Sequence, residues 1–418
     1  MSFKTIVKLK DVSLYSKEKI QLADLNEKNY VSTENLLPNF GGKEVSSGLP
    51  NVLKVNKYVN KDILVSNIRP YFKKIWQASD TGGASNDVLI FSPTNRIHPD
   101  FLYYSLANDH FFEYVMSGSK GTKMPRGDKK HIMEYELILP ELNEQANISK
   151  VFIDIDKKIE NNNQINNILE NMAQAIFKQW FVDFEFPNED GEPYKSSGGQ
   201  MVESELGMIP EGWEVKRIKE LNLYTSDYVA NGSFKSLKEN VNLYEEENYA
   251  VFMRNTDLKN GFKSMKFTDK HSYEFLSKSV LFGNEVIISN VADVGSVYLC
   301  PDLARPMTLG NNVIMLKSNT DSKLNYFYYR LFKSREGQHL LGTITSGSAQ
   351  LKFNKTDFRN LSICYPEAEK MGRYLDIEHS IEESIQKNNK ESRKLIKLRD
   401  TLLPKLMSGE IRVPLDNN

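Results

Sequence analysis

Residues 148–180, ISKVFIDIDKKIENNNQINNILENMAQAIFKQW, predict a long helix, because their apolar side chains recur at alternating steps of three and four residues. This spacing is the heptad pattern of a coiled coil. We therefore expect the helix to pack along its length against a second helix. The expected seam consists of Ile148, Phe152, Ile155, Ile159, Asn162, Asn166, Leu169, Ala173, Ile176 and Trp180.

A second copy of the pattern occurs 226 positions later, in residues 374–406. Its seam is weaker at the ends, but both copies have an asparagine at the same step, Asn162 and Asn388. A polar residue at a seam position fixes the register of a coiled coil at a cost in stability. Two antiparallel helices would bring Asn162 opposite Asn388, whereas the alternative is two amphipathic helices, each packed on its own domain. The prediction rests on the seam residues Ile155, Ile159, Asn162, Leu169, Ile381, Ile385, Asn388 and Leu395.

The segments outside the two helices also repeat. Residues 62–68 and 86–91 are short apolar runs that predict strands, residues 101–114 predict a helix, and residues 135–139 predict a further strand. Matching segments recur at offsets of 223, 225 and 226 positions, at residues 286–291, 325–331 and 361–366. Repetition at a nearly constant offset indicates a duplicated structural unit.

The repeat predicts an α+β protein with two globular domains, each followed by a long helix, and the two helices forming an antiparallel coiled coil. The segment after the first helix is acidic and rich in turn-forming residues, so we expect it to be a linker. The expected boundaries are 1–147 for the first domain, 148–186 for the central helix, 187–206 for the linker, 207–370 for the second domain and 371–411 for the C-terminal helix.

Composition limits the classes of protein to consider. The chain has 418 residues, enough for two or three domains, with 26% charged and 40% hydrophobic residues and a formal net charge of -1. No apolar run approaches the roughly 20 residues that a membrane-spanning helix needs. The two cysteines, Cys300 and Cys364, cannot build a disulfide framework. We therefore expect a cytoplasmic protein without a membrane partner.

Sequence motifs for catalysis are missing. We find no GxxxxGK[ST] phosphate loop, no HExxH or CxxC metal motif, and no GxGxxG after a predicted strand. The six histidines have no metal-ligand spacing. The tripeptide Glu214-Val-Lys216 is common and we interpret it as a solvated surface. We therefore predict no catalytic residue and no metal site, and a chain that binds rather than catalyses.

The loop before the strand at 135–139 is a candidate nucleic-acid contact. Between residues 120 and 130 it holds five cations and one acid, Asp128, interleaved with glycines. Glycines let backbone amides approach a phosphate, and cations displace its counterions. The candidate DNA-binding residues of this loop are Lys120, Thr122, Lys123, Arg126, Lys129 and Lys130.

The repeat places a chemically different loop at the corresponding position of the second domain, in residues 345–355. Its candidate DNA-binding residues are Ser346, Ser348, Gln350, Lys352, Asn354 and Lys355. Glutamine and asparagine can pair with adenine, whereas arginine prefers guanine. Loops that differ in this way are expected of two modules that recognise different sequences, and the alternative is that both loops are plain solvated surface.

Four segments carry a resemblance to a known family. They are FKQWFVDFEF at 177–186, PYKSSGG at 193–199, GMIPEGW at 207–213 and LRDTLLPKLMSGEI at 398–411. They closely resemble the DNA specificity subunit of type I restriction-modification systems. The resemblance extends over the whole chain and includes the duplication.

The resemblance implies that each globular domain is a target recognition domain that reads one half of a bipartite site in double-stranded DNA. It implies a helical spacer to which modification subunits, two of them, and restriction subunits bind. Methyl transfer and cleavage would then belong to those partners, which use S-adenosylmethionine and ATP, and this chain would need no cofactor. The alternatives are a duplicated protein-binding scaffold and a self-contained methyltransferase or nuclease.

Overall fold

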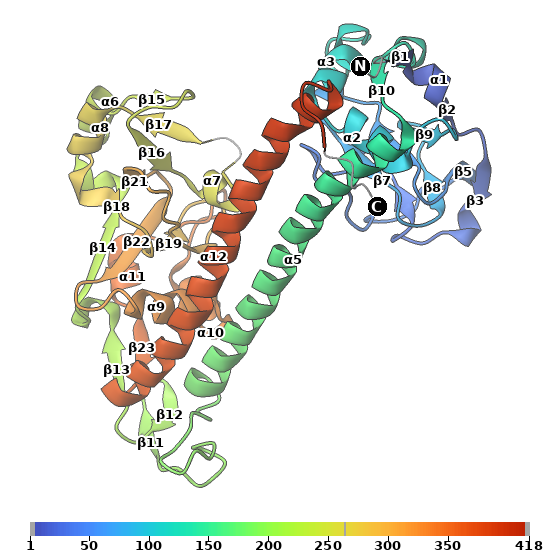
Figure 1. The fold of residues 1–418 in the computed structure, drawn as a ribbon. Coiled ribbons are helices and arrows are strands. Elements are labelled where there is room, and N and C mark those ends of the chain that lie inside the picture. Colours follow the sequence, from blue (N-terminus) through green and yellow to red (C-terminus); the bar gives the residue numbers. More distant parts are fainter. Residues whose placement is uncertain (1–4, 263–264, 414–418) are drawn as a thin grey trace. The chain divides into compact units, whose positions relative to one another are not determined.

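The computed structural model describes residues 5–262 and 265–413, so residues 1–4 of the expected first domain and 263–264 of the expected second domain lie outside it (Figure 1). The chain forms two compact units. The first unit consists of Met1–Asn163 with Asn389–Asn418, and the second of Gln164–Asn388. Each unit therefore contains a globular domain and a part of both long helices.

The first unit is built on two four-stranded sheets and one strand pair. One sheet has the order β2-β9-β6-β7 and the other β3-β5-β8-β4. Their strands are β2 (Ser13–Tyr15), β9 (Val88–Pro93), β6 (Ile63–Ser66), β7 (Ile75–Gln77), β3 (Lys19–Gln21), β5 (Lys54–Tyr58), β8 (Gly82–Ala84) and β4 (Tyr30–Val31). A separate antiparallel pair joins β1 (Thr5–Lys8) to β10 (Glu136–Leu139).

Strand β6 shows why a strand of the central sheet has a continuous apolar sequence. Ile63 and Val65 belong to the core formed with the helices, whereas Leu64 belongs to the core formed with Tyr58 and Val31 of the second sheet. Successive side chains of a strand point to opposite faces. Both faces of this strand are therefore covered, and its first three residues, 63–65, are all apolar.

The second unit repeats this arrangement, which confirms the predicted duplication and the α+β class. Its central sheet has the order β14-β22-β19-β20 and a strand pair again lies beside it. These strands are β14 (Leu223–Asp227), β22 (Val313–Ser318), β19 (Val286–Ser289), β20 (Val297–Leu299), β13 (Glu214–Arg217) and β23 (Ser362–Tyr365). The additional strands are β15 (Leu243–Tyr244), β17 (Lys266–Thr268), β16 (Ala250–Met253), β21 (Met307–Leu309) and β18 (Val280–Leu281) in one sheet, and β11 (Met201–Ser204) with β12 (Gly207–Pro210) in a hairpin.

The single helix predicted over residues 101–114 is wrong, because the chain forms two helices there. It leaves the first helix at Ala107, and Asn108 caps the second by accepting a hydrogen bond from the Phe111 amide at 2.9 Å. Ser334 caps the corresponding helix of the second unit. The repeated helices are α2 (Pro99–Leu106), α3 (Asp109–Ser117) and α4 (Lys129–Ile132) in the first unit and α9 (Leu324–Lys333), α10 (Arg335–Ile344) and α11 (Lys355–Arg359) in the second. The other short helices are α1 (Leu9–Val12) in the first unit and α6 (Phe234–Asn240), α7 (Asn255–Lys259) and α8 (Lys270–Phe275) in the second.

The long helices are α5 (Leu142–Phe181) and α12 (Ala368–Met407), and they pack together. In the first unit the Asn162 amide donates to the Ser392 hydroxyl at 3.2 Å. In the second unit the Asn388 amide donates to Asn166 Oδ1 at 2.9 Å. Within each unit the two helices therefore pair in antiparallel orientation.

The seam is apolar toward the helix ends and polar in its middle. In the second unit Ala173 packs with Ile381 and Ile385, and with the half-buried Leu169. In the first unit Ile155 is buried, and Ile159 and Leu395 are half-buried. The ends of the helices enter the domain cores through Ile148, Phe152, Leu403 and Leu406 in the first unit and through Phe177, Trp180, Tyr374 and Leu375 in the second.

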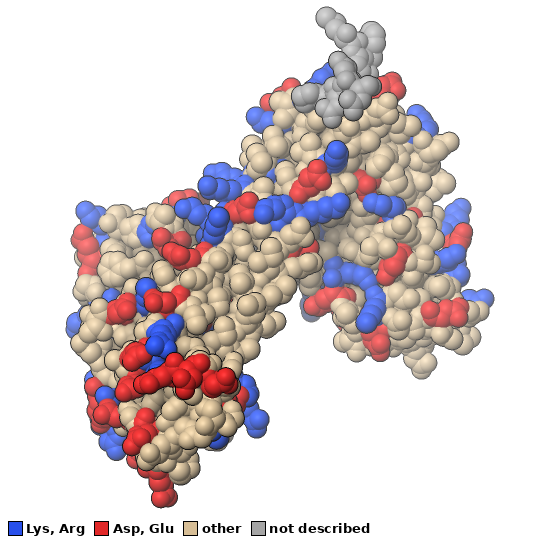
Figure 2. All heavy atoms as spheres, turned by 60° about the horizontal axis from the view of Figure 1, so that its bottom comes forward, with Lys and Arg blue, Asp and Glu red and all other residues tan. Residues whose placement is uncertain are grey.

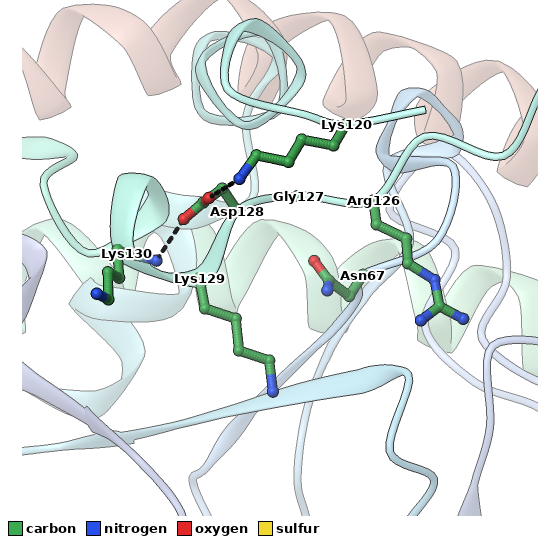
Figure 3. A pocket seen from close by; sticks show the side chains of 7 residues that line it. All are labelled: Asn67, Lys120, Arg126, Gly127, Asp128, Lys129 and Lys130. Carbon is green, nitrogen blue, oxygen red and sulfur yellow. Dashed lines mark hydrogen bonds and ion pairs between the residues drawn. The ribbon is translucent and has the colours of Figure 1, made fainter. Parts of the chain in front are cut away.

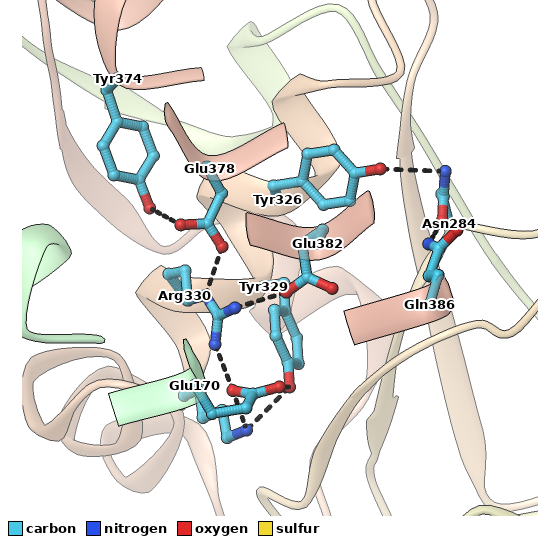
Figure 4. A network of polar contacts seen from close by, with 10 residues as sticks. Glu170, Asn284, Tyr326, Tyr329, Arg330, Tyr374, Glu378, Glu382 and Gln386 are labelled. Carbon is cyan, nitrogen blue, oxygen red and sulfur yellow. Dashed lines mark hydrogen bonds and ion pairs between the residues drawn. The ribbon is translucent and has the colours of Figure 1, made fainter. Parts of the chain in front are cut away.

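A buried ionic network joins α9 to both long helices in the second unit (Figure 4). Arg330 is fully buried, donates from Nε to Glu378 at 2.5 Å, and pairs through its other nitrogens with Glu382 and Glu170. Lys333 Nζ lies 3.1 Å from the Glu170 carboxylate. Three carboxylates thus share two cations. Burial is the main cause that raises the pKa of Glu382 to about 7. The neighbouring carboxylates raise this pKa further, and Arg330 opposes both effects.

The first unit has a counterpart in which the cation comes from a different element. Arg399 of α12 lies 3.0 Å from the Asp156 carboxylate of α5, and the Tyr104 hydroxyl of α2 donates to the same carboxylate at 2.7 Å. Asp156 corresponds to Glu382 at the repeat offset of 226. The arginine is therefore supplied by the long helix α12 in the first unit and by the globular domain, through α9, in the second.

The raised pKa of Glu382 predicts a pH-dependent stability. Folding raises this pKa from its ordinary value of 4.5 to about 7, so the contribution of Glu382 to stability is complete below pH 4.5 and is lost as the pH rises through 7. Glu382→Gln should therefore raise the free energy of unfolding relative to wild type by about 3 kcal/mol more at pH 8 than at pH 5.

The measurement is chemical denaturation of both proteins at the two pH values. Glu383→Gln on the same helix is the matched control, because the Glu383 side chain is 69% exposed. An equal effect of Glu382→Gln at pH 5 and pH 8 would contradict the conclusion that folding raises the pKa of Glu382.

Candidate nucleic-acid interface

The basic loop of the first unit closes as a small hairpin between α3 and α4. Lys120 and Arg126 exchange backbone hydrogen bonds at 2.9 and 3.0 Å. Arg126 is also bridged to Ile68, and the Arg69 amide donates to the Pro125 carbonyl at 2.8 Å. The loop is therefore fixed at its base to the segment that follows the buried strand β6.

The corresponding loop of the second unit has the same backbone anchors. Ser346 and Lys352 exchange hydrogen bonds at 2.9 Å each, Lys352 is bridged to Val291, and the Ala292 amide donates to the Leu351 carbonyl at 2.9 Å. Gly347 has φ +113, and a Cβ there would lie 2.3 Å from the Gln350 carbonyl oxygen. The two loops are thus of equal length and differ mainly in their side chains.

The first loop borders a pocket, shown in Figure 3. Lys120 Nζ lies 3.0 Å from Asp128, and Arg126 lies 3.1 Å from Asp87. The pKa of the Asp128 carboxyl is lowered to about 2, mainly by the hydrogen bond from the Lys120 ammonium and further by those from the helix amides that Asp128 caps. The pocket is lined by Asn67, Lys120, Arg126, Gly127, Asp128, Lys129 and Lys130.

The cations of the first loop fall into two groups. Lys120 and Arg126 are paired with acids, but their side chains are 83% and 58% exposed, and exposed ion pairs are weak and exchangeable. Lys123, Lys129 and Lys130 are exposed and form no ion pair with any described residue. Thr122 is exposed beside Lys123 at the tip. Four of the six predicted residues, Lys120, Arg126, Lys129 and Lys130, therefore line the same pocket, and Thr122 and Lys123 do not.

The six candidates of the second loop divide differently. Ser346, Ser348, Gln350 and Lys352 are exposed on the hairpin. Asn354 instead caps α11, accepting from the Asp357 amide at 2.9 Å and donating to its carboxylate at 2.7 Å. Lys355 lies 3.1 Å from Asp227. The side chains of Asn354 and Lys355 are thus engaged within the protein, and the exposed polar groups of this loop are two serine hydroxyls, the Gln350 amide and the Lys352 ammonium.

Sequence reasoning missed the residues that lie beside the first loop but far from it in the chain. Asn67 lines the pocket, and the Arg69 amide is bonded to Pro125 at the hairpin base. The signal that was available is the sequence Arg69-Pro-Tyr-Phe-Lys-Lys74, in which basic residues flank the turn former proline and two aromatic residues.

Charges of both signs occur over the face shown in Figure 2, in keeping with the formal net charge of -1. Attraction to a polyanion must therefore come from local groups of cations rather than from the total charge. Among the described residues, no set of His, Cys, Asp or Glu side chains is placed to hold a metal ion. No described helix combines the length and the apolar composition that crossing a bilayer requires.

Comparison with known proteins identifies the family. The model of the type I restriction modification DNA specificity domain matches residues 2–171 and 210–397. The specificity subunit of the type I restriction enzyme HindI from Haemophilus influenzae is 25% identical, over 91% of this chain and 94% of that protein. The MjaIX specificity subunit from Methanocaldococcus jannaschii is 28% identical, over 77% and 71%. The fold is similar to that of the S subunit from M. genitalium, with a TM-score of 0.57, 13% identity, and coverage of 97% and 96%. The chain therefore belongs to the type I restriction-modification DNA specificity family.

Proposed function

We propose that the chain reads a bipartite target in double-stranded DNA, one half with the domain at residues 1–147 and the other with the domain at residues 207–370. The observation that supports this is the pair of reading loops. Both loops have the same backbone anchors and the same length, but one presents several lysines and an arginine, and the other presents serines, a glutamine and a single lysine. A common scaffold with different side chains suits two readers of different base sequences.

The chain is part of a type I restriction-modification complex. We infer that modification subunits, two of them, and restriction subunits bind it, and that S-adenosylmethionine and ATP are used by these partners. The part of this chain would be to bind the target and to place the partner enzymes on it.

We infer also that α5 and α12 form a spacer that sets the number of unread base pairs between the half-sites. Each helix has 40 residues, and a helix rises 1.5 Å per residue, which gives a length of roughly 60 Å. Cores at both ends of the pair hold the helices in register.

The loop hypothesis predicts different effects for two substitutions. Lys123→Ala should weaken binding to any duplex and reduce the slope of log affinity against log salt by about one unit, because it removes one phosphate contact. Arg126→Ala should cost about 1–3 kcal/mol on the target and relax the preference at one base pair. Titrations of target and non-target duplexes at several salt concentrations measure both effects.

Lys54→Ala serves as the control, because Lys54 is an exposed lysine of β5 outside the loop. If Lys123→Ala and Arg126→Ala both bind like the control at every salt concentration, the loop is ordinary surface.

Domain replacement tests the division of the target. Exchanging residues 207–370 for the recognition domain of another family member should change one half of the methylated motif and leave the other half intact. The readout is methylome sequencing of cells that express the chimaera with the modification subunit. The donor should carry arginine at the position of Arg330, since Glu378 and Glu382 would otherwise be buried without their cation. A chimaera in which both half-sites change would refute independent domains.

The spacer hypothesis predicts the effect of one extra heptad in each helix. Because Asn166 pairs with Asn388, matched insertions lie between Asn166 and Asn167 and between Lys387 and Asn388. They lengthen the pair by about 10 Å, or about three base pairs, so the unread gap should grow while the half-sites stay the same. Insertion into one helix alone should break the pairing and lower the yield of folded protein. An active double insertion with an unchanged gap would show that the helices do not set the distance.

A further inference from the structure

A short turn beside the first loop has an unusual conformation. Directly after β6, residues 70–72 form one turn of 3₁₀ helix. Arg69 and Lys73 flank it with φ values of 50° and 54°, a left-handed conformation that non-glycine residues adopt rarely. Such outliers persist only where the surroundings determine them, and they occur often at binding sites.

Backbone hydrogen bonds fix this turn on both sides. On one side the Arg69 amide donates to Pro125 of the basic loop at 2.8 Å. On the other side the Asn39 amide donates to the Phe72 carbonyl at 2.8 Å, and the Phe40 amide donates to the Lys73 carbonyl at 3.0 Å. The turn is therefore held in place and continuous with the proposed DNA-binding loop.

The turn exposes aromatic rings where cations gather. Tyr71 is 46% exposed and Phe72 is 39% exposed, with ring centroids 4.6 Å apart. The half-buried Arg69 precedes them, and Lys73, which is paired with Asp109 at 2.7 Å, follows them. The exposed cations nearest in the fold are those of the basic loop to which the turn is bonded. Exposed aromatic rings beside such a loop match a nucleic-acid partner, because cations attract the phosphates while a ring contacts the bases or their methyl groups.

The second domain shows that the fold does not require these side chains. Its corresponding turn begins with Ala292, which has φ 65°, and continues as Asp293-Val294-Gly295. It holds no aromatic residue and no cation. Asp293 there accepts contacts from within the domain, including Lys259 Nζ at 3.1 Å and the Ser296 hydroxyl at 3.0 Å. The same backbone anchor thus forms in both domains, although the turn carries Asp293, bound within the domain, in the second and the exposed rings of Tyr71 and Phe72 in the first.

We propose that the turn at residues 69–73 is a second DNA-reading element of the first recognition domain, in which the Tyr71 ring contacts the bases of the half-site that the basic loop also reads. The proposal rests on the proposed function and adds to it a specificity-determining residue. It also makes the two domains unequal, since only the first reads with an aromatic side chain at this turn.

The test uses the full chain together with its modification subunit. Tyr71→Ala should weaken binding to the target duplex about tenfold, with little effect on a non-target duplex. It should also relax the sequence preference at one base pair, in the same half-site in which Arg126→Ala relaxes a preference. Tyr71→Phe keeps the ring and should retain the wild-type motif. Leu53→Ala removes another exposed apolar side chain of this domain, 86% exposed, and should change nothing.

The outcomes separate this inference from the proposed function. Wild-type affinity and an unchanged motif for a folded Tyr71→Ala protein would overturn the reading role of the turn while leaving the bipartite target intact. Loss of the modification subunit from Tyr71→Ala, with DNA binding unchanged, would also overturn it, because the turn would then be a protein contact. Failure of the wild-type complex to bind any specific duplex would overturn both the function and the inference.

Discussion

The buried guanidinium of Arg330 constrains how the second recognition domain is attached to its helices. Its carboxylate partners come from α5 and from α12, while Arg330 itself belongs to α9 of the domain. Separating any of these three elements would leave an uncompensated charge in the interior, which costs several kcal/mol. The network therefore holds α9, and through it α10 and the reading loop that follows, in one orientation on the helix pair.

The first recognition domain is attached by a different network. There Arg399 of the long helix and Tyr104 of the domain share the Asp156 carboxylate. The two attachments are not interchangeable, because a domain that carries its own arginine would meet a second arginine in the first unit. Each domain therefore matches the charged groups of its own helix segments, which disfavours an exchange of the two domains when the duplicated chain folds.

Heptad and strand periodicity sufficed to predict the long helices, the duplication and strands such as β6, since these depend on local patterns of apolar residues. The break before Asn108 was missed because apolar residues continue across it. The contact between Arg69 and Pro125 joins residues distant in the chain, so no sequence pattern could reveal it.

We propose that the two loops share one backbone scaffold and that their exposed side chains determine which base pairs each loop recognises. Exchanging the loops tests this proposal most directly. Residues 347–351 of the second domain would be replaced by residues 121–125 of the first, with the anchor residues Ser346 and Lys352 left in place. Methylome sequencing of cells that express this variant with the modification subunit would give its target. The account predicts that the half-site of the second domain changes at one or more base pairs while the other half-site stays the same. An unchanged motif in an active, folded variant would show that these loops do not read the DNA.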